Sequence, residues 1–181
     1  LEASTKAYGC EFSFDPIVAS GKDAALPHYD GNKKLASGFC VIDFGVKFKG
    51  YCSDITRTIY FGKPKKEEVL AYEKVLLVQE QCKQMIREKV AMKKPYNYAS
   101  KELGKAFTHS LGHGIGIEIH EAPNLSSKSK EKFEKGMVFT IEPGVYYAGK
   151  FGIRIEDDYL INSQGKVEEL TSVPKKLICI T

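Results

Sequence analysis

The chain has 181 residues, 43% of them hydrophobic and 28% charged, which is the balance of one ordinary globular domain with a single core. Its net charge of +4 comes from lysines and arginines scattered without a basic block, so the composition excludes the usual signature of a nucleic-acid-binding protein. No apolar run approaches the roughly 20 residues of a membrane-spanning helix, so we expect no membrane partner either.

The five cysteines are an odd number and show no C-x-x-C spacing. This pattern indicates neither a disulfide framework nor a thiolate zinc site, and it favours a reducing, cytoplasmic location. The chain begins at Leu1 without a charged and apolar leader, so we expect a fragment or a processed product.

The first part of the chain predicts one interrupted strand and a loop. FSFDPIVAS is typical of a strand broken at Pro16, and Gly21 to Ser37 has the composition of a loop. This loop contains His28. A histidine in a loop is more often merely solvated than functional, so its position alone does not assign it a role.

The stretch from Gly38 to Tyr60 predicts two antiparallel strands, Phe39–Phe44 and Tyr51–Tyr60, joined by a tight turn. Both segments are rich in β-branched and aromatic residues, and a short Lys/Gly segment separates them. We expect the turn to centre on Phe48 and Lys49.

This register places Asp43 directly opposite Asp54. Two carboxylates with Cβ atoms roughly 5 Å apart reduce stability unless something between them compensates, and a divalent cation would do so. The alternative is a register shifted by one residue, which would leave one of the two carboxylates on the solvent face.

Two helices are expected next. Apolar residues recur every three or four positions from Val69 to Val90, with acidic residues in the first turn and Lys89 near the end. Pro95 is expected to break this helix, and Tyr98 to Phe107 predicts a second, shorter one. We expect both helices to serve packing alone.

The segment THSLGHGIGIEIHEAP, Thr108 to Pro123, contains three of the four histidines, His109, His113 and His120. Its glycines are too frequent for a stable helix, whereas the isoleucines between 115 and 119 alternate as in a strand. Imidazoles gathered in this way favour metal ligation or acid–base chemistry over coincidence.

The remainder predicts further strands. The segment from Asn124 to Lys135 is polar, so we expect a solvent-exposed loop there. Strands are expected after it at Met137–Glu142 and Ile153–Ile161. Asn162 to Gly165 predicts a turn, and the tail from Val167 to Ile180 is typical of an edge segment.

The chain contains a short internal duplication. GFCVIDFGV, Gly38 to Val46, and GMVFTIEPGV, Gly136 to Val145, each lead through an apolar run to a carboxylate and then to a Gly-Val pair. A second carboxylate follows on each returning strand. A histidine in a Pro-marked loop precedes each copy. In the first copy the two carboxylates are Asp43 and Asp54, and the histidine is His28. In the second copy the carboxylates are Glu142 and Glu156, and the histidine is His120.

Burying four carboxylates on strands without partners would cost a prohibitive amount of folding free energy. Two divalent cations would compensate their charge. Oxygen ligands with one imidazole from His113 suit manganese, cobalt or iron better than a thiolate-type zinc site. The alternative is that lysines and arginines neutralise the carboxylates. Arg154, two residues before Glu156, points to the same face of the strand and could hold one of them.

These motifs resemble the pita-bread metallopeptidases, and within them the Xaa-Pro dipeptidases, or prolidases. The resemblance covers nearly the whole chain through FDPIVASG, ALPHY, IDFGVKFKGYCSDITRT, HSLGHGIGIEIHEAP, MVFTIEPGVY and GIRIEDDYLI. It implies an α+β fold whose two duplicated halves are arranged about a pseudo-twofold axis around a curved antiparallel sheet.

The resemblance also implies roles for the site residues. Asp43 would bind one metal, Asp54 and Glu156 would bridge both, and His113 and Glu142 would bind the other. The implied cofactors are two divalent ions, manganese or cobalt, with zinc or iron as alternatives. His28 and His120 match the family's substrate-side histidines.

The implied reaction is hydrolysis of the peptide bond before proline in Xaa-Pro dipeptides, by a water that bridges two metal ions. Glu142 would carry a proton from the water to the departing nitrogen, and His120 would donate to the oxyanion. His28 and Arg154 would orient the proline end or the ligand shell. The expected partners are a proline-containing dipeptide or short peptide and a second copy of the chain in a homodimer.

Three alternatives remain open. Aminopeptidase P belongs to the same proline-specific branch. The methionine aminopeptidases share the GHGIG and IEPG segments, although their last ligand segment usually differs from GIRIEDDYLI. The third alternative is a catalytically silent binding module with this fold.

The chain departs from the family's pattern at its start. The family carries a pair of helices before the strands of each half, but here the first half begins almost at its strand, and the usual amino-terminal domain is absent. We therefore expect residues 1–181 to be one pita-bread catalytic domain truncated on its amino-terminal side, or one whose missing segments form another chain. One side of the sheet would then be uncovered and prone to association.

Overall fold

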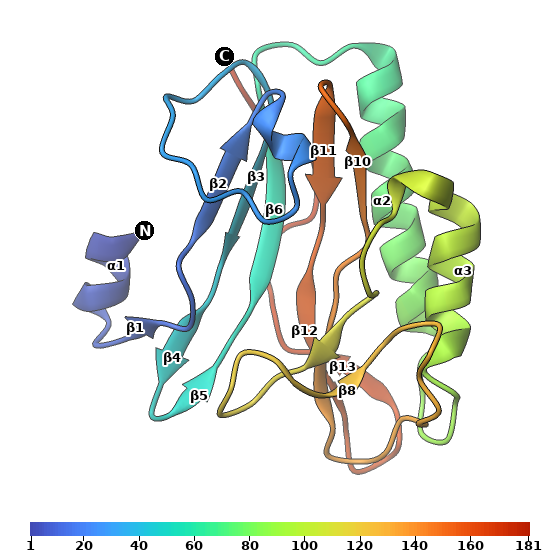
Figure 1. Cartoon of the computed structure of the whole chain (residues 1–181). Helices are drawn as coiled ribbons and strands as arrows, with labels where there is room; N and C mark the ends of the chain where they lie inside the picture. Colours follow the sequence, from blue (N-terminus) through green and yellow to red (C-terminus); the bar gives the residue numbers. More distant parts are fainter.

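The computed structural model describes all 181 residues as an α+β structure. Its strands form the centre of the molecule, and the two longer helices lie together on one side of them (Figure 1). The helices are α1 Glu2–Ala7, α2 Lys66–Met85 and α3 Lys93–Leu103, with 3₁₀ turns at Asp23–Ala25 and Gly104–Ala106. None of the helices combines the length and the apolar character needed to cross a bilayer.

The strands form four sheets. The largest has the order β13-β12-β9-β7-β8 and the next β14-β6-β3-β2, while β1-β4-β5 and β10-β11 make smaller ribbons. In chain order the strands are β1 Glu11–Phe12, β2 Ile17–Ser20, β3 Gly38–Phe44, β4 Val46–Phe48, β5 Tyr51–Cys52, β6 Ile55–Phe61, β7 His113–Gly114, β8 Glu121–Asn124, β9 Val138–Ile141, β10 Gly144–Tyr147, β11 Phe151–Arg154, β12 Asp157–Ile161, β13 Val167–Glu169 and β14 Cys179–Ile180.

The first hairpin consists of β3 with β6 and its extension, β4 with β5. Its turn lies at Lys49 and Gly50, whose φ angles of 51° and 87° are those of a type I′ turn. The predicted register is therefore wrong by two positions, because Asp43 pairs with Thr56 rather than Asp54. A shift of two residues preserves the face of every side chain, so both carboxylates still face the same side.

The second hairpin consists of β9 with β12 and its extension, β10 with β11. The expected strand at Ile153–Ile161 exists but is interrupted at Ile155 and Glu156, and the opposite strand is interrupted at Glu142 and Pro143. The pairs Ile141–Asp157 and Gly144–Arg154 keep one register across this break, which sets Glu142 opposite Glu156.

The register also shows which positions of the two hairpins are equivalent. Ile42 and Asp43 correspond to Ile141 and Glu142. On the returning strands, Glu156 corresponds to Thr56, so the second carboxylates of the two hairpins, Asp54 and Glu156, do not occupy equivalent positions. Thr56 Oγ1 donates to Glu156 Oε2 at 2.6 Å, so equivalent residues meet where the two hairpins join, as expected at a pseudo-twofold axis.

The helix α2 covers the second hairpin and packs on β9 and β11, and α3 packs against α2. The expected apolar face of α2 is buried and includes Tyr72, Val75, Val78 and Cys82. The expected ends are wrong, because α2 stops at Met85 and Pro95 lies in the first turn of α3. A proline is tolerated there because the first amides of a helix have no intrahelical acceptor.

Two other expectations are corrected. Ile115 to Ile119 do not form a strand, because only His113 and Gly114 pair as β7 and Ile117 is 60% exposed. The polar segment 124–135 is not wholly solvated, since Leu125 and Phe133 are fully buried in the main core. The expected turn at Asn162–Gly165 is confirmed, and β13 and β14 lie at sheet edges as expected for the tail.

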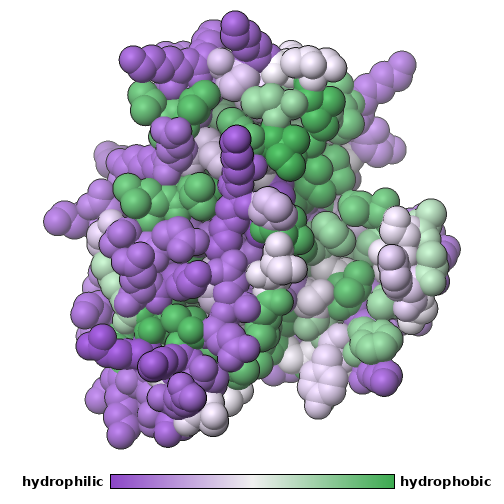
Figure 2. Space-filling model, turned by 180° about the vertical axis from the view of Figure 1, so that it is seen from behind, coloured by the Kyte–Doolittle hydropathy of each residue, from purple (hydrophilic) through white to green (hydrophobic).

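No helix covers the outer face of the first hairpin. An apolar groove of about 290 Å³ runs there, lined among others by Ile42, Phe44, Ile55 and Ile59. Figure 2 views the molecule from behind and shows hydrophobic residues gathered on this side. The face opposite Asp43 and Asp54 is therefore open, which agrees with the expected absence of first-half helices.

Candidate metal centre

A cavity of about 140 Å³ lies between the two hairpins. Its walls contain every site residue expected from the sequence, together with three apolar side chains. The residues are Asp43, Asp54, His113, Glu142, Glu156, Arg154, His28 and His120, with Phe14, Ile17 and Ile119. A larger groove of about 710 Å³ lies at the ends of β2, β3 and β6 and shares none of these residues.

Strand ends and strand breaks position the carboxylates. Asp43 is the penultimate residue of β3, and Asp54 immediately precedes β6. Glu142 follows β9, and Glu156 lies between β11 and β12. These positions bring carboxylates from the two hairpins to one cavity.

His113 lies on β7 between two glycines that the packing requires. A Cβ at Gly112 would lie 2.0 Å from the Thr140 carbonyl oxygen, and one at Gly114 would lie 2.2 Å from that of Ala122. Both neighbours are backbone atoms and cannot give way. The glycines thus permit the close approach that inserts His113 between β8 and β9.

The imidazole of His113 is oriented toward the carboxylates. Its Nδ1 lies 3.0 Å from the Gly114 carbonyl oxygen, a contact that requires the proton on Nδ1. Nε2 is then free as a lone-pair donor and lies 3.6 Å from both Asp54 Oδ2 and Glu142 Oε1. A carbonyl that fixes the tautomer in this way is typical of a metal-ligating histidine.

Arg154 supplies the positive charge closest to Asp43. Its guanidinium donates to Asp43 Oδ2 at 2.6 Å, to Thr56 Oγ1 at 3.1 Å and to the Tyr146 hydroxyl at 2.8 Å. Arg154 is 4% exposed, so its charge is buried with its partners. The expectation that it holds a carboxylate is met geometrically by Asp43.

Several carboxylate oxygens of the pocket have no partner, and this decides whether the residues fit a cation. Asp43 Oδ1, Asp54 Oδ1 and Glu156 Oε1 are buried without any hydrogen-bond partner. Atoms of Asp54, His113 and Glu156 lie within 4.8 Å of one another. Unpartnered carboxylate oxygens around one imidazole fit a divalent cation with oxygen-rich ligation.

The protonation of the carboxylates reflects the same crowding. Burial raises the pKa of Asp54 to about 9, with Asp43, Glu142 and Asp158 adding to the effect. The pKa of Glu156 is raised well above its usual value, also chiefly by burial, and that of Glu142 to about 7. Without a cation, the pocket therefore favours protonated carboxylates.

His28 and His120 lie at the exposed side of the cavity. His28 comes from the loop after the first 3₁₀ turn, and His120 from the irregular segment before β8. The ring centroid of His120 lies 4.4 Å from that of His113. Both histidines can meet a ligand that enters from solvent.

Two further residues at the site received no role from the sequence. His109 was noted only as part of the histidine cluster, and it lies 3.0 Å from the Tyr146 hydroxyl and 3.9 Å from Glu142 Oε2. Burial lowers its pKa to about 4.

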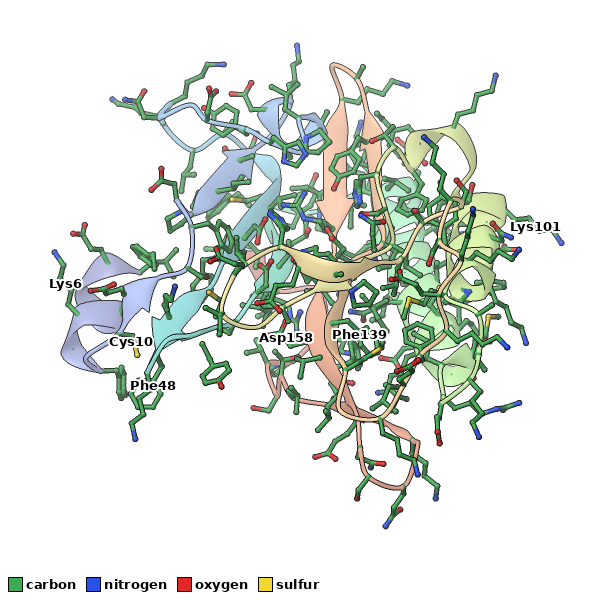
Figure 3. The ribbon with its side chains drawn as sticks, turned by 60° about the horizontal axis from the view of Figure 1, so that its bottom comes forward. Lys6, Cys10, Phe48, Lys101, Phe139 and Asp158 are labelled. Carbon is green, nitrogen blue, oxygen red and sulfur yellow. The ribbon has the colours of Figure 1, made fainter.

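Asp158 accepts a hydrogen bond from the Asp54 amide at 3.0 Å and lies near the middle of the molecule (Figure 3). The only sequence signal for Asp158 was its place beside Asp157 in the acidic run of GIRIEDDYLI.

Comparisons with known proteins identify the family of the chain. The family model described as metallopeptidase family M24 matches residues 1–163. An uncharacterized peptidase of Staphylococcus aureus is 42% identical over 183 residues, which is 97% of this chain and 52% of that protein. The chain thus spans about half the length of the curated relatives it matches.

Two solved structures are similar over almost the whole chain. The Xaa-Pro dipeptidase from Bacillus anthracis has a TM-score of 0.93 at 42% identity, covering 99% of this chain and 52% of its own. The X-Pro aminopeptidase from Thermotoga maritima has a TM-score of 0.93 at 40% identity, covering 99% and 53%. The α+β pita-bread fold and the resemblance to prolidases are confirmed. The chain belongs to metallopeptidase family M24.

Proposed function

We propose that this chain carries the metal-binding catalytic residues of an Xaa-Pro dipeptidase. One observation carries the proposal: three buried carboxylate oxygens without hydrogen-bond partners, from both hairpins, line one cavity with the imidazole of His113. The similarity to the Bacillus anthracis Xaa-Pro dipeptidase supports the proline-specific reading. Residues 1–181 would be the catalytic domain, truncated on its amino-terminal side.

In this proposal two divalent ions are held by Asp43, Asp54, His113, Glu142 and Glu156. The oxygen-rich set favours manganese or cobalt, with zinc or iron as alternatives. When bound, such ions would polarise the scissile carbonyl and lower the pKa of the attacking water.

The chain's own residues then move the protons. Glu142 takes a proton from the attacking water and gives it to the departing nitrogen, a role that suits a carboxyl whose side chain is 16% exposed within the cavity. The exposed imidazole of His120 donates to the developing oxyanion. His28 orients the proline end, and Arg154 acts through Asp43, whose Oδ2 it holds.

The cavity also suits a proline residue. The imide nitrogen of proline has no hydrogen, so a site that recognises the carbonyl and the ring does not lose a contact. Phe14, Ile17 and Ile119 give the cavity an apolar wall that a pyrrolidine ring can contact.

The length of the preferred peptide distinguishes the two proline-specific activities. The Thermotoga maritima X-Pro aminopeptidase has the same TM-score as the Bacillus anthracis dipeptidase, so aminopeptidase P activity is the second candidate. Hydrolysis of a Xaa-Pro dipeptide, compared with that of a longer peptide beginning Xaa-Pro, separates the two. A methionine aminopeptidase would cleave a Met-Ala-Ser peptide instead.

The decisive experiment titrates manganese and cobalt into the purified chain and follows both metal binding and peptide hydrolysis. We expect saturable binding, cleavage of the Xaa-Pro dipeptide, and loss of both in Asp43→Asn. Metal binding without cleavage of any of the three peptides would favour a binding module. Failure of the chain to bind either metal would contradict the metal centre.

We also propose a cytoplasmic location and a homodimer. All five cysteines are free, which suits a reducing compartment. The open apolar face of the first hairpin supports association. Light scattering on the eluting peak of a gel-filtration column measures the mass directly, and a monomer at micromolar concentration would contradict the dimer.

A further inference from the structure

Gln79 is a fully buried polar side chain of α2 on the face that packs against the second hairpin. Its neighbours on this face, such as Val75, Val78 and Cys82, are apolar and make the packing contacts. A buried amide is unfavourable in such surroundings unless it forms hydrogen bonds. Its presence at this position therefore needs a reason other than packing.

The amide reaches the two breaks of the second hairpin. Gln79 Nε2 donates to the Ile141 carbonyl at 3.3 Å, to the Ile155 carbonyl at 3.4 Å and to Asp157 Oδ2 at 2.8 Å. Two hydrogens thus serve three acceptors on opposite strands. One side chain of the helix ties both strands together at the point where each leaves its regular pairing.

The two carbonyls belong to the residues that precede the two glutamates of the site. Ile141 precedes Glu142 and Ile155 precedes Glu156, and neither glutamate lies within a strand. The orientation of each glutamate therefore depends on the peptide group before it. A group that fixes both peptides also fixes the relative placement of the two carboxylates.

We propose that Gln79 is a positioning residue for the candidate metal centre. Its amide cross-links the peptide groups before Glu142 and Glu156 and holds the two carboxylates at the separation that the metal site requires. The metal-binding part of this inference rests on the proposed function, whereas the positioning of the glutamates does not.

The unused half of the amide supports this assignment. Gln79 Oε1 is buried without a hydrogen-bond partner. A residue selected only to fill space would avoid this cost, because an apolar side chain of the same length has no unpaired acceptor. The unpaired Oε1 of Gln79 is unfavourable for stability, whereas its Nε2 supplies the hydrogen bonds to both strands.

The first hairpin has no corresponding device, because no helix covers it. Strand residues of the second hairpin hold it instead. Arg154 donates to the Asp43 carboxylate, and Asp158 accepts from the backbone amide of Asp54. Loss of Gln79 should therefore loosen Glu142 and Glu156 and leave the first hairpin unchanged.

The test compares Gln79→Met, which keeps the length but removes both N–H donors, with Val75→Ala as a matched core variant. Val75 is fully buried one turn away on the same helix and contacts neither break through a hydrogen bond. Gln79→Leu is a second variant that also lacks both donors, and it covers the case in which the methionine variant fails to fold.

The first measurement is residue-resolved amide hydrogen exchange in the metal-free chain. The Glu142 amide donates to the Leu111 carbonyl at 2.8 Å, and the Glu156 amide to the Thr56 carbonyl at 3.1 Å. We expect both Gln79 variants to accelerate exchange of these two amides at least about 10-fold relative to the amides of β3 and β6. Val75→Ala should change all of these amides equally.

The second measurement is manganese affinity by titration calorimetry well below the unfolding temperature. Loss of a residue that orients ligands typically weakens metal binding about 10- to 100-fold, and we expect this for both Gln79 variants but not for Val75→Ala. Exchange and affinity profiles identical to those of Val75→Ala would overturn the proposal. If the unsubstituted chain bound no manganese, the proposed function would fail, while the exchange data would still decide the role of Gln79.

Discussion

The two hairpins share one backbone plan but differ in what surrounds them. Ile42 and Ile141 occupy equivalent positions just before the first carboxylate of each hairpin. Ile141 is fully buried beneath α2, whereas Ile42 is half-buried beside an apolar groove. Repetition of a strand register therefore does not ensure repetition of its environment, because the helices that cover one copy are absent from the other.

The hairpins also differ in charge where their strands return. Thr56 stands where the second hairpin has Glu156, and Asp54 stands where it has Arg154. A perfectly symmetric site would have a carboxylate at each of these equivalent positions. Here one position is a neutral hydroxyl and another a guanidinium, so the cavity keeps its acidic residues with only one buried cation among them.

The largest expected effect is the loss of Glu156, the carboxylate at the meeting point of the hairpins. Glu156→Gln removes one of the unpartnered oxygens, so we expect manganese affinity and hydrolysis of a Xaa-Pro dipeptide to fall more than about 100-fold. Titration calorimetry and a chromatographic peptide assay measure the two quantities. Glu168→Gln, on the exposed edge strand β13, is the control and should match the unsubstituted chain.

Removal of the one buried cation of the site should come next. Arg154→Met leaves Asp43 buried without its partner, and breaking such a pair costs roughly 3–5 kcal/mol of unfolding free energy. Urea denaturation of the metal-free chain measures this cost.

Asp43→Asn combined with Arg154→Met supplies the control for the Arg154 prediction. The double variant should be less destabilised than the sum of the two single changes, because the interaction is then lost only once. Strict additivity would show that the ion pair contributes nothing to stability.

The equivalent isoleucines test the difference in environment directly. Ile141→Ala should cost roughly 2–5 kcal/mol, because it leaves a cavity beneath α2, while Ile42→Ala should cost about 1 kcal/mol or less. Urea denaturation at low protein concentration measures both changes. Equal costs would mean that something covers the first hairpin in solution, and a concentration dependence of the Ile42→Ala cost would identify it as a second copy.

A pH dependence is the last expected effect. The folded-state pKa of Asp54 is raised to about 9, so its contribution to stability is fully present below the unfolded value near 4 and is lost as the pH rises toward 9. In the metal-free chain, Asp54→Asn should therefore gain stability relative to the unsubstituted chain between pH 5 and pH 9, by at least about 1.4 kcal/mol.

Thermal unfolding of both chains across this pH range gives the difference, and added manganese should reverse its sign, because the cation then replaces the proton on Asp54. A difference that does not vary with pH would contradict the raised pKa.

The set of site residues was predictable from the sequence because each carries a local signal. A carboxylate that ends an apolar strand, a histidine between glycines and a motif repeated in order are all readable along the chain. These signals led to Asp43, Asp54, His113, Glu142 and Glu156, which the structure brings to one cavity. Their faces survived a register error of two positions, because side chains alternate with a period of two.

The tertiary structure alone decided how these residues are held. The pairing of Arg154 with Asp43 and the hydrogen bonds of Gln79 from α2 to the second hairpin are contacts between segments up to 111 positions apart. Local periodicity carries no information about such partners. The sequence by itself determined which groups the site contains, because the chemical groups of a site are those of its side chains. The fold decided their partners, because hydrogen bonds and burial depend on distances that only the folded chain defines.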